Sequence, residues 1–168
     1  MIQLLKRLCR IFHRELSLEE IANKAPAYRF FRGLSKEKNF TPEGYVRASA
    51  FEFNDHTKER PDNNWEASIN WDDDSNSLTT LLEQRSEKTN QLMFDSYSYI
   101  LLSQLKSNLA ISLDQGHLDY ERKPLPHNKY HGNLLSPATV DRKTKELIKS
   151  NLAMIATQNL KKESDRSR

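Results

Sequence analysis

Three short runs of alternating side chains limit the fold of this chain more than its other features do. They occupy residues 27–33, 45–53 and 65–71. Successive side chains of a β-strand point to opposite faces, so alternation over this length is typical of a half-buried strand. One face of the third run is wholly apolar: Trp65, Ala67, Ile69 and Trp71. The runs therefore predict three strands of one sheet.

Two further segments predict additional strands. Residues 93–101 fit a strand that leads into a short helix, although their apolar spacing also fits a helix throughout. Residues 109–113 fit another strand. The sequence Asp114-Gln115-Gly116 favours a turn, and residues 117–121 would then be the hairpin partner of that strand.

Helical signals stand near the N-terminus. Residues 2–14 carry apolar side chains at helical spacing with basic side chains on the other side. Ser17 and Glu20 form a capping box, which predicts that a second helix begins at Leu18. Pro26 ends it, because the residue before a proline is pushed out of the helical region.

Helical signals also follow the strands. Ser136 and Pro137 predict the N-terminus of the last helix, where a proline costs no hydrogen bond. Its apolar stripe is expected to include five residues: Val140, Leu147, Ile148, Leu152 and Ile155. The run Asp72-Asp73-Asp74 lacks the alternation and the glycine of an EF-hand loop, so we interpret it as the N-terminal chemistry of a helix over 78–87.

This order of elements predicts the fold class. Helices at both ends with strands between them indicate an α+β domain, with a small, largely antiparallel sheet, an N-terminal helical hairpin and a C-terminal helix. The length of 168 residues suits one domain. We expect residues 1–160 to form it and residues 161–168 to be a polar, flexible tail.

Charge is distributed unevenly along the chain. Residues 54–75 hold seven acidic and two basic side chains, a net charge of −5. Residues 121–149 hold seven basic and three acidic side chains, a net charge of +4. The simpler interpretation is two solvated faces of opposite sign. The alternative is a basic surface that contacts nucleic acid.

Cysteine usage and hydropathy indicate the compartment. The lone Cys9 cannot form an intramolecular disulfide, which is typical of a reducing environment. The first fourteen residues are interrupted by charge too often for a signal peptide. No apolar run is long enough to span a membrane. We expect a cytoplasmic protein, and the absence of nucleotide-binding loops and paired cysteines predicts no cofactor.

Residues 123–135 gather several chemically capable side chains. Two prolines force extended backbone ahead of His127, which with Asn128 and His131 is a candidate catalytic group. If a metal binds, His127 and His131 are its candidate ligands. A third ligand has no recognisable spacing, so we expect no metal site. The simpler interpretation is that His127 and Asn128 hydrogen-bond to the loop backbone and that His131 packs half-buried.

The same stretch resembles HNH nucleases, which present His, Asn and His on a ββα hairpin around one metal. The predicted hairpin over 109–121, then His127, Asn133 and the helix from Pro137, follow that order. The usual Asp-His pair is absent and the spacings differ from those of the family. The resemblance implies a small metal-dependent nuclease or nucleotide-processing enzyme.

Three arginines come from two neighbouring predicted strands. Arg29, Arg32 and Arg47 could together bind a phosphate or carboxylate through their planar guanidinium groups. The alternative is pairing with surface acids. The run 28–33 also resembles the opening strand of ADP-ribosyltransferase-like folds, without the later Ser and Glu elements of that family.

A further resemblance rests on three motifs: Ala48-Ser49-Ala50-Phe51, Ala67-Ser68-Ile69-Asn70, and the stretch from Pro124 to Gly132. Together they resemble a group of small bacterial proteins of no assigned activity, with S-x-A-F, S-V/I and P-x-P-x-N-P-x-H motifs. The likeness covers residues 27–135, and this chain has Lys129 where the group has proline. It implies a bacterial cytoplasmic protein, a common fold and four shared positions: Ser49, Ser68, Asn128 and His131.

Two functions follow from these observations. The first is a non-catalytic accessory subunit of a bacterial multi-protein system, such as one of anti-phage or anti-plasmid defence. Its partner protein would bind the apolar side chains of the first helix, with Leu4, Leu8 and Ile11 as candidate contacts. The second is the small nuclease centred on His127 and His131.

Overall fold

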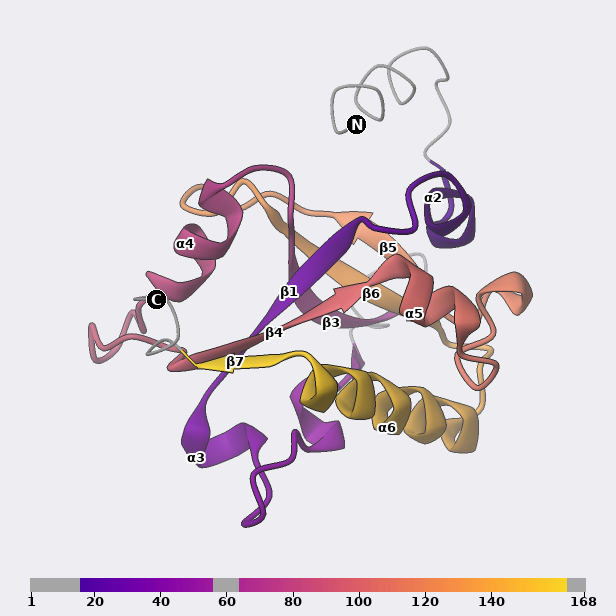
Figure 1. The fold of residues 1–168 in the computed structure, drawn as a ribbon. Helices are drawn as coiled ribbons and strands as arrows, with labels where there is room; N and C mark the ends of the chain where they lie inside the picture. The colour runs from indigo at the N-terminus through magenta and orange to yellow at the C-terminus, as the bar shows by residue number, and fades with distance from the viewer. Residues whose placement is uncertain (1–15, 56–63, 163–168) are drawn as a thin grey trace.

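A computed structural model describes residues 16–55 and 64–162 (Figure 1). Within them the chain forms one antiparallel sheet in the order β5-β6-β3-β1-β4-β7, with β2 paired to β3. The strands are β1 (Arg29–Leu34), β2 (Asn54–Asp55), β3 (Asn64–Trp71), β4 (Ser96–Leu101), β5 (Asp119–Arg122), β6 (His131–Pro137) and β7 (Leu160–Lys162). The helices are α2 (Leu18–Lys24), α3 (Lys36–Asn39), α4 (Asn76–Leu82), α5 (Leu102–Ser107) and α6 (Arg142–Gln158), and the 3-10 turns are η1 (Ala48–Phe51) and η2 (Leu113–Gln115). The predicted α+β class is confirmed.

The sheet has two long ladders and one short junction. β3 pairs with β6 along nearly its whole length, and β1 pairs with β4 along all of its residues. By contrast, β1 and β3 are in register at only two positions, Phe30↔Trp71 and Phe31↔Asn70. The strands predicted over 27–33 and 65–71 are β1 and β3, and they meet at this junction.

Beyond the junction, a side chain takes the place of main-chain pairing between β1 and β3. The Arg32 Nε donates to the Ala50 carbonyl at 2.8 Å, and its Nη1 donates to the Ser68 carbonyl of β3. Arg32 lies between Phe30 and Leu34 on the core side of β1, and burial lowers its pKa to about 10. Its guanidinium therefore links β1, η1 and β3.

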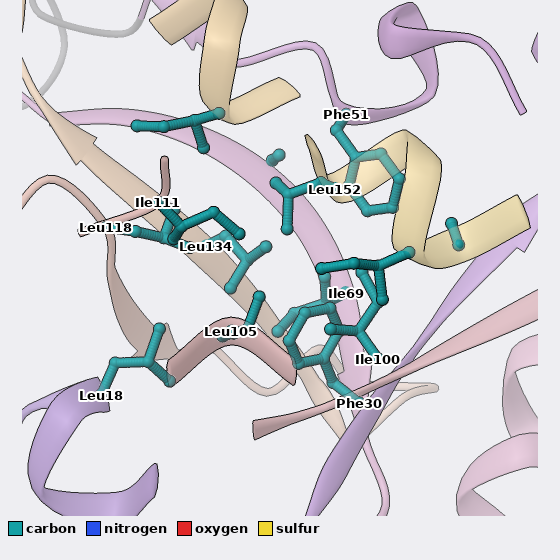
Figure 2. Packing of buried hydrophobic residues seen from close by; sticks show 14 of the residues in the cluster. Leu18, Phe30, Phe51, Ile69, Ile100, Leu105, Ile111, Leu118, Leu134 and Leu152 are labelled. Carbon is teal, nitrogen blue, oxygen red and sulfur yellow. The ribbon is translucent and has the colours of Figure 1, made fainter. Parts of the chain in front are cut away.

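The core lies between the sheet and the helical segments α5, α6 and η1. Figure 2 shows side chains of the strands, including Phe30, Ile69 and Ile100, packed beside Phe51 of η1 and Leu152 of α6. Each such side chain contributes about 1.5–3 kcal/mol when it is fully buried. The alternation in β3 predicts this placement, because Ile69 and its neighbours Ala67 and Trp71 are all buried.

The prediction of a strand over 45–53 is wrong. That segment forms one β-bridge, Phe40↔Val46, and then η1. Its buried apolar residues do not alternate, since Ala50 and Phe51 are adjacent in the chain. Alanine has low strand propensity, so the 3-10 turn that places Phe51 in the core prevails.

The predicted hairpin over 109–121 is also wrong. Ser112 adopts a left-handed backbone with φ 48°, and Leu109 is 91% exposed, so residues 109–113 form no strand. The second half of the hairpin exists as β5, but β5 pairs with β6. Asp114 and Gln115 therefore belong to η2, and Gly116 is its C-cap.

The last helix begins later than predicted. Residues 131–137, which include both Ser136 and Pro137, form β6. The N-cap of α6 is instead Asp141, whose carboxylate accepts the Thr144 N–H at 2.9 Å. β6 was missed because residues 132–136 are buried on both faces of the strand, and such a strand shows no alternation.

The other predicted elements are confirmed with small shifts. Ser17 and Glu20 cap α2 as a capping box, and residues 93–107 form β4 followed by α5. The predicted helix over 78–87 is α4, which ends before Glu83. The expected tail over 161–168 begins inside a strand, because Lys161 and Lys162 belong to β7.

Some predictions fall on residues that the structure does not describe. The first helix, over 2–14, lies outside the described residues, so α2 is the described part of the expected helical hairpin. In the described ranges, 16–55 and 64–162, every helix is too short or too polar to cross a membrane.

Candidate functional site

Two polar segments that are distant in sequence meet where β3 ends. Asp72, Asp73 and Asp74 follow β3, and Asn128 and Tyr130 precede β6. Because β3 and β6 are antiparallel neighbours, the two segments lie side by side. The Trp71 N–H donates to the Tyr130 carbonyl at 3.0 Å. We call the three aspartates and the side chains that they contact the polar cluster.

Asp73 is the centre of a stacked group. Its carboxylate accepts two hydrogen bonds from Arg122, at 2.7 and 3.0 Å, and another from the Tyr28 hydroxyl. The Arg122 guanidinium lies 4.5 Å from the ring centroid of Trp71, and the Tyr28 ring stacks on the same indole with 5.6 Å between the ring centroids. Cation–π contact and charge-assisted hydrogen bonds thus hold this group together.

Tyr28→Phe is expected to reduce the alkaline sensitivity of the fold. Burial and the hydrogen bond to Asp73 raise the pKa of the Tyr28 phenol above its usual value near 10, although Arg122 opposes the shift. Because the pKa of Tyr28 is higher in the folded than in the unfolded state, its protonated phenol contributes its full stabilisation below about pH 10. That stabilisation is lost as pH rises further. Urea-unfolding midpoints from pH 8 to 11 should fall more steeply for wild type than for Tyr28→Phe. Equal slopes would contradict this assignment, and Tyr45→Phe, at an exposed tyrosine, is the matched control.

The other two aspartates are also engaged. Asp72 accepts a hydrogen bond from the Arg29 Nε at 2.6 Å. Asp74 accepts one from the Tyr130 hydroxyl at 2.6 Å and one from the N–H of Asn76, the first residue of α4, at 2.8 Å. The bond from Tyr130 and the bond from Asn76 lower the pKa of Asp74. This is the helix N-terminal role that the sequence predicts for the aspartate run.

The acidic and basic segments of the sequence neutralise each other here. Where residues 54–75 are described, three ion pairs join them to residues 121–149: Arg122–Asp73, Lys123–Glu66 and Lys129–Asp74. Two more basic side chains of the second segment, Lys145 and Lys149, are buried. The predicted solvated faces of opposite sign are therefore partly one paired surface.

Asn128 is a buried structural residue. Its Nδ2 donates to the Asn70 Oδ1 at 2.7 Å, and its Oδ1 accepts the Tyr130 N–H at 3.1 Å and the Asn70 Nδ2 at 3.3 Å. Asn70 also donates to the Ser77 carbonyl. Every polar atom of the Asn128 amide therefore has a protein partner, including the loop backbone that the sequence predicts.

The two histidines are placed differently. His127 is exposed, whereas His131 is half-buried with its Nδ1 2.8 Å from the Lys123 carbonyl oxygen. Within residues 16–55 and 64–162, no group of three or more His, Cys, Asp or Glu side chains is arranged to hold a metal ion.

The secondary structure around the histidines differs from that of an HNH nuclease. The resemblance requires a hairpin over 109–121 and a helix from Pro137, but the first is not formed and Pro137 ends β6. The four positions that the other bacterial group shares come from different elements: Ser49 from η1, Ser68 from β3, Asn128 from a loop and His131 from β6, the strand paired with β3.

The three candidate arginines do not converge. Arg29 pairs with Asp72 at the start of β1, and its guanidinium lies 5.1 Å from the ring centroid of Tyr99. Arg32 is bound by two carbonyl oxygens on the core side. Arg47 precedes η1, where its Nε donates to the Phe40 carbonyl. They therefore form no common binding site for phosphate or carboxylate.

A hollow lies beyond the other end of β1, between α6 and the segment that follows α3. It has a cavity volume of about 570 Å³. We call it the α6 groove and define it by six of its lining residues: Tyr45, Val46, Arg47, Ser150, Ala153 and Met154. The Val46 N–H donates to the Thr157 Oγ1 at 2.9 Å, which fixes the 41–47 segment against α6. Figure 1 shows this segment and α6 at the same side of the molecule.

Large apolar side chains are exposed along this groove. Tyr45 is 60% exposed, Met154 52% and Leu147, two helical turns before Met154, 49%. Leu147 belongs to a second hollow that shares Ser150 with the groove. A deeper pocket of about 930 Å³ adjoins it through Arg47. Leu147 therefore adds one exposed apolar side chain two turns before Met154, in a hollow that polar and charged residues otherwise line.

Sequence reasoning missed this groove. It assigned Leu147 to the buried stripe of the last helix, and that assignment is wrong. The stripe actually runs through Ile148, Leu152 and Ile155. The available signal was the presence of Leu147 and Met154 seven residues apart, off the buried stripe and therefore on the face that points to solvent.

Comparisons with protein-family models, curated proteins and solved structures found no match for this chain. The candidate contacts Leu4, Leu8 and Ile11 lie outside the described residues.

Proposed function

We propose that this chain is a non-catalytic binding subunit that docks a partner protein in the α6 groove. One observation carries the proposal: among the seven large hydrophobic side chains that are exposed in the described residues, Tyr45 and Met154 line this groove, and Leu147 lines the hollow that shares Ser150 with it. Exposed apolar side chains grouped in this way mark interaction sites in soluble proteins, whereas single ones do not.

The hydrogen bonds within the polar cluster support the same proposal. A general acid or base needs a titratable group that can exchange a proton with a substrate. The three aspartates instead accept hydrogen bonds from Arg29, Tyr28, Arg122 and Tyr130. These contacts stabilise the end of the sheet, which is a structural role.

The ion pairs favour a protein over nucleic acid as the partner. A nucleic-acid surface depends on cations that remain free to neutralise phosphates. Arg122, Lys123 and Lys129 already face carboxylates across the paired surface. The α6 groove, in contrast, offers apolar area, which drives protein association.

The test is recovery of a partner from the producing cell with a tagged full-length chain. Wild type should retain a partner at fixed stoichiometry, and Met154→Lys should lose most of it. Met154→Lys places a cation near the C-terminus of α6, where it does not disturb the helix. Leu109→Lys is the matched control, because Leu109 is 91% exposed and lies outside the groove.

The outcomes separate the two functions. Retention of the partner by Met154→Lys would contradict docking in the groove. Loss of biological function in folded His127→Ala and His131→Ala variants, with the partner still bound, would favour the enzyme alternative instead.

A further inference from the structure

Among the described residues that line the α6 groove, one has a charged side chain. Arg47 is that residue, and the neighbouring lining atoms come from apolar, hydroxyl and amide side chains. The guanidinium uses its Nε for the Phe40 carbonyl. No ion pair joins Arg47 to a carboxylate within the described residues, so its terminal nitrogens remain available as donors.

One acid near Arg47 already has a hydrogen-bond partner. Glu43 lies close enough for the charge of Arg47 to act on it, but the hydrogen bond from Thr41 has the larger influence in lowering the pKa of that carboxyl. In the adjoining pocket, Asp95 accepts the Lys36 N–H at 3.0 Å and the Ser96 hydroxyl at 2.9 Å. Asp95 is therefore held by other donors, and Glu43 forms no ion pair with Arg47 within the described residues.

We propose that the segment docked in the α6 groove carries one carboxylate, from Asp or Glu, beside its apolar anchors, and that Arg47 binds this carboxylate. This inference rests on the proposed function and specifies the chemistry of the partner. A partner that covers Arg47 removes its guanidinium from water, which is costly unless a carboxylate replaces the lost hydration. A planar guanidinium matches a carboxylate with two parallel hydrogen bonds.

Charge argues against the N-terminal segment of this chain as the occupant. Its apolar residues are interspersed with Lys6, Arg7, Arg10 and Arg14, and it has no acidic residue before Glu15. Such a segment would bring cations to Arg47. Like charges placed together at an interface weaken association, so an acidic and apolar segment is the better match.

The probe is a library of random twelve-residue peptides displayed on phage and selected on the immobilised full-length chain. Enriched peptides should place Asp or Glu within a few residues of a large apolar side chain. The affinity of a synthetic copy should fall at least tenfold for Arg47→Gln and further for Arg47→Glu. A peptide whose acid is replaced by Lys should bind Arg47→Glu, and it should bind neither wild type nor Arg47→Gln with comparable affinity. Lys106→Glu, at an exposed residue of α5, is the matched control.

Each outcome decides between the two proposals. Peptides that require Tyr45 and Met154 but ignore Arg47 would overturn this inference and leave docking in the groove intact. Peptides that ignore all three residues, or no enrichment, would overturn both proposals. A dimer in light scattering that Met154→Lys dissociates would identify a second copy as the occupant and overturn the inference of an acidic partner.

Discussion

Asn128→Asp is expected to lower the free energy of unfolding by about 3–5 kcal/mol at neutral pH, since it leaves an uncompensated charge in the interior. Asn128 is 3% exposed, and its Nδ2 donates to the Asn70 Oδ1 at 2.7 Å. The substitution keeps the shape of the side chain but places a carboxylate oxygen against that acceptor. The buried amide pair would thus become a repulsive contact.

The loss should depend on pH in a defined direction. Burial and the facing oxygen raise the pKa of the introduced carboxyl in the folded protein, and a protonated carboxyl can donate to Asn70 as the amide does. The variant should therefore approach wild-type stability below the usual carboxyl pKa of about 4 and fall behind as pH rises.

Chemical unfolding of both proteins at pH 4 and pH 7.5 measures this difference. Asn23→Asp, at an exposed position in the last turn of α2, is the matched control and should cost no more than about 1 kcal/mol at pH 7.5, because its anion faces the negative end of the helix dipole. A deficit of Asn128→Asp that is equal at the two pH values would show that lost packing, rather than buried charge, is responsible.

Gly132→Ala is expected to cost about 1–3 kcal/mol through overpacking. A methyl group at this position would lie 2.5 Å from the Glu121 carbonyl oxygen and 2.6 Å from the Nε1 of Trp71. The first neighbour is backbone of the adjacent strand, and the second belongs to a fully buried indole. Neither can move aside without disturbing β5 or the stacked group around Trp71.

A double-mutant cycle separates these two clashes. Trp71→Phe removes Nε1, so Gly132→Ala should be less costly in the Trp71→Phe background, with a coupling energy of about 0.5–3 kcal/mol. Urea unfolding of the four proteins gives the coupling. Strict additivity would mean that the strand backbone alone sets the cost.

The fold was predictable wherever one face of an element meets the core and the other meets solvent. The alternation in residues 65–71 gives β3, and the Ser17–Glu20 capping box gives the start of α2. The same rule explains the failure at residues 131–137. Both faces of β6 are covered, so its pattern does not repeat every two residues.

The candidate site was harder to predict because its parts come from distant segments. The sequence singled out Asp72–Asp74 and residues 123–135 separately, and only the antiparallel pairing of β3 and β6 brings them together. The role of Asn128 depends on Asn70, which carries no motif. The α6 groove depends on Thr157 holding Val46, a contact between residues more than one hundred positions apart.

We expect the short junction between β1 and β3 to act as a hinge between two parts of the sheet, each a ribbon of paired strands. One ribbon contains the β3–β6 ladder, the other contains the β1–β4 ladder, and two register positions connect them. Opening at the hinge breaks few backbone hydrogen bonds, so its amide protons should exchange faster than those of either ladder. Arg32 bridges the ribbons next to η1, the turn that follows Arg47. A partner that restrains Arg47 would therefore also restrain η1, and through η1 the Arg32 side chain that bridges the hinge.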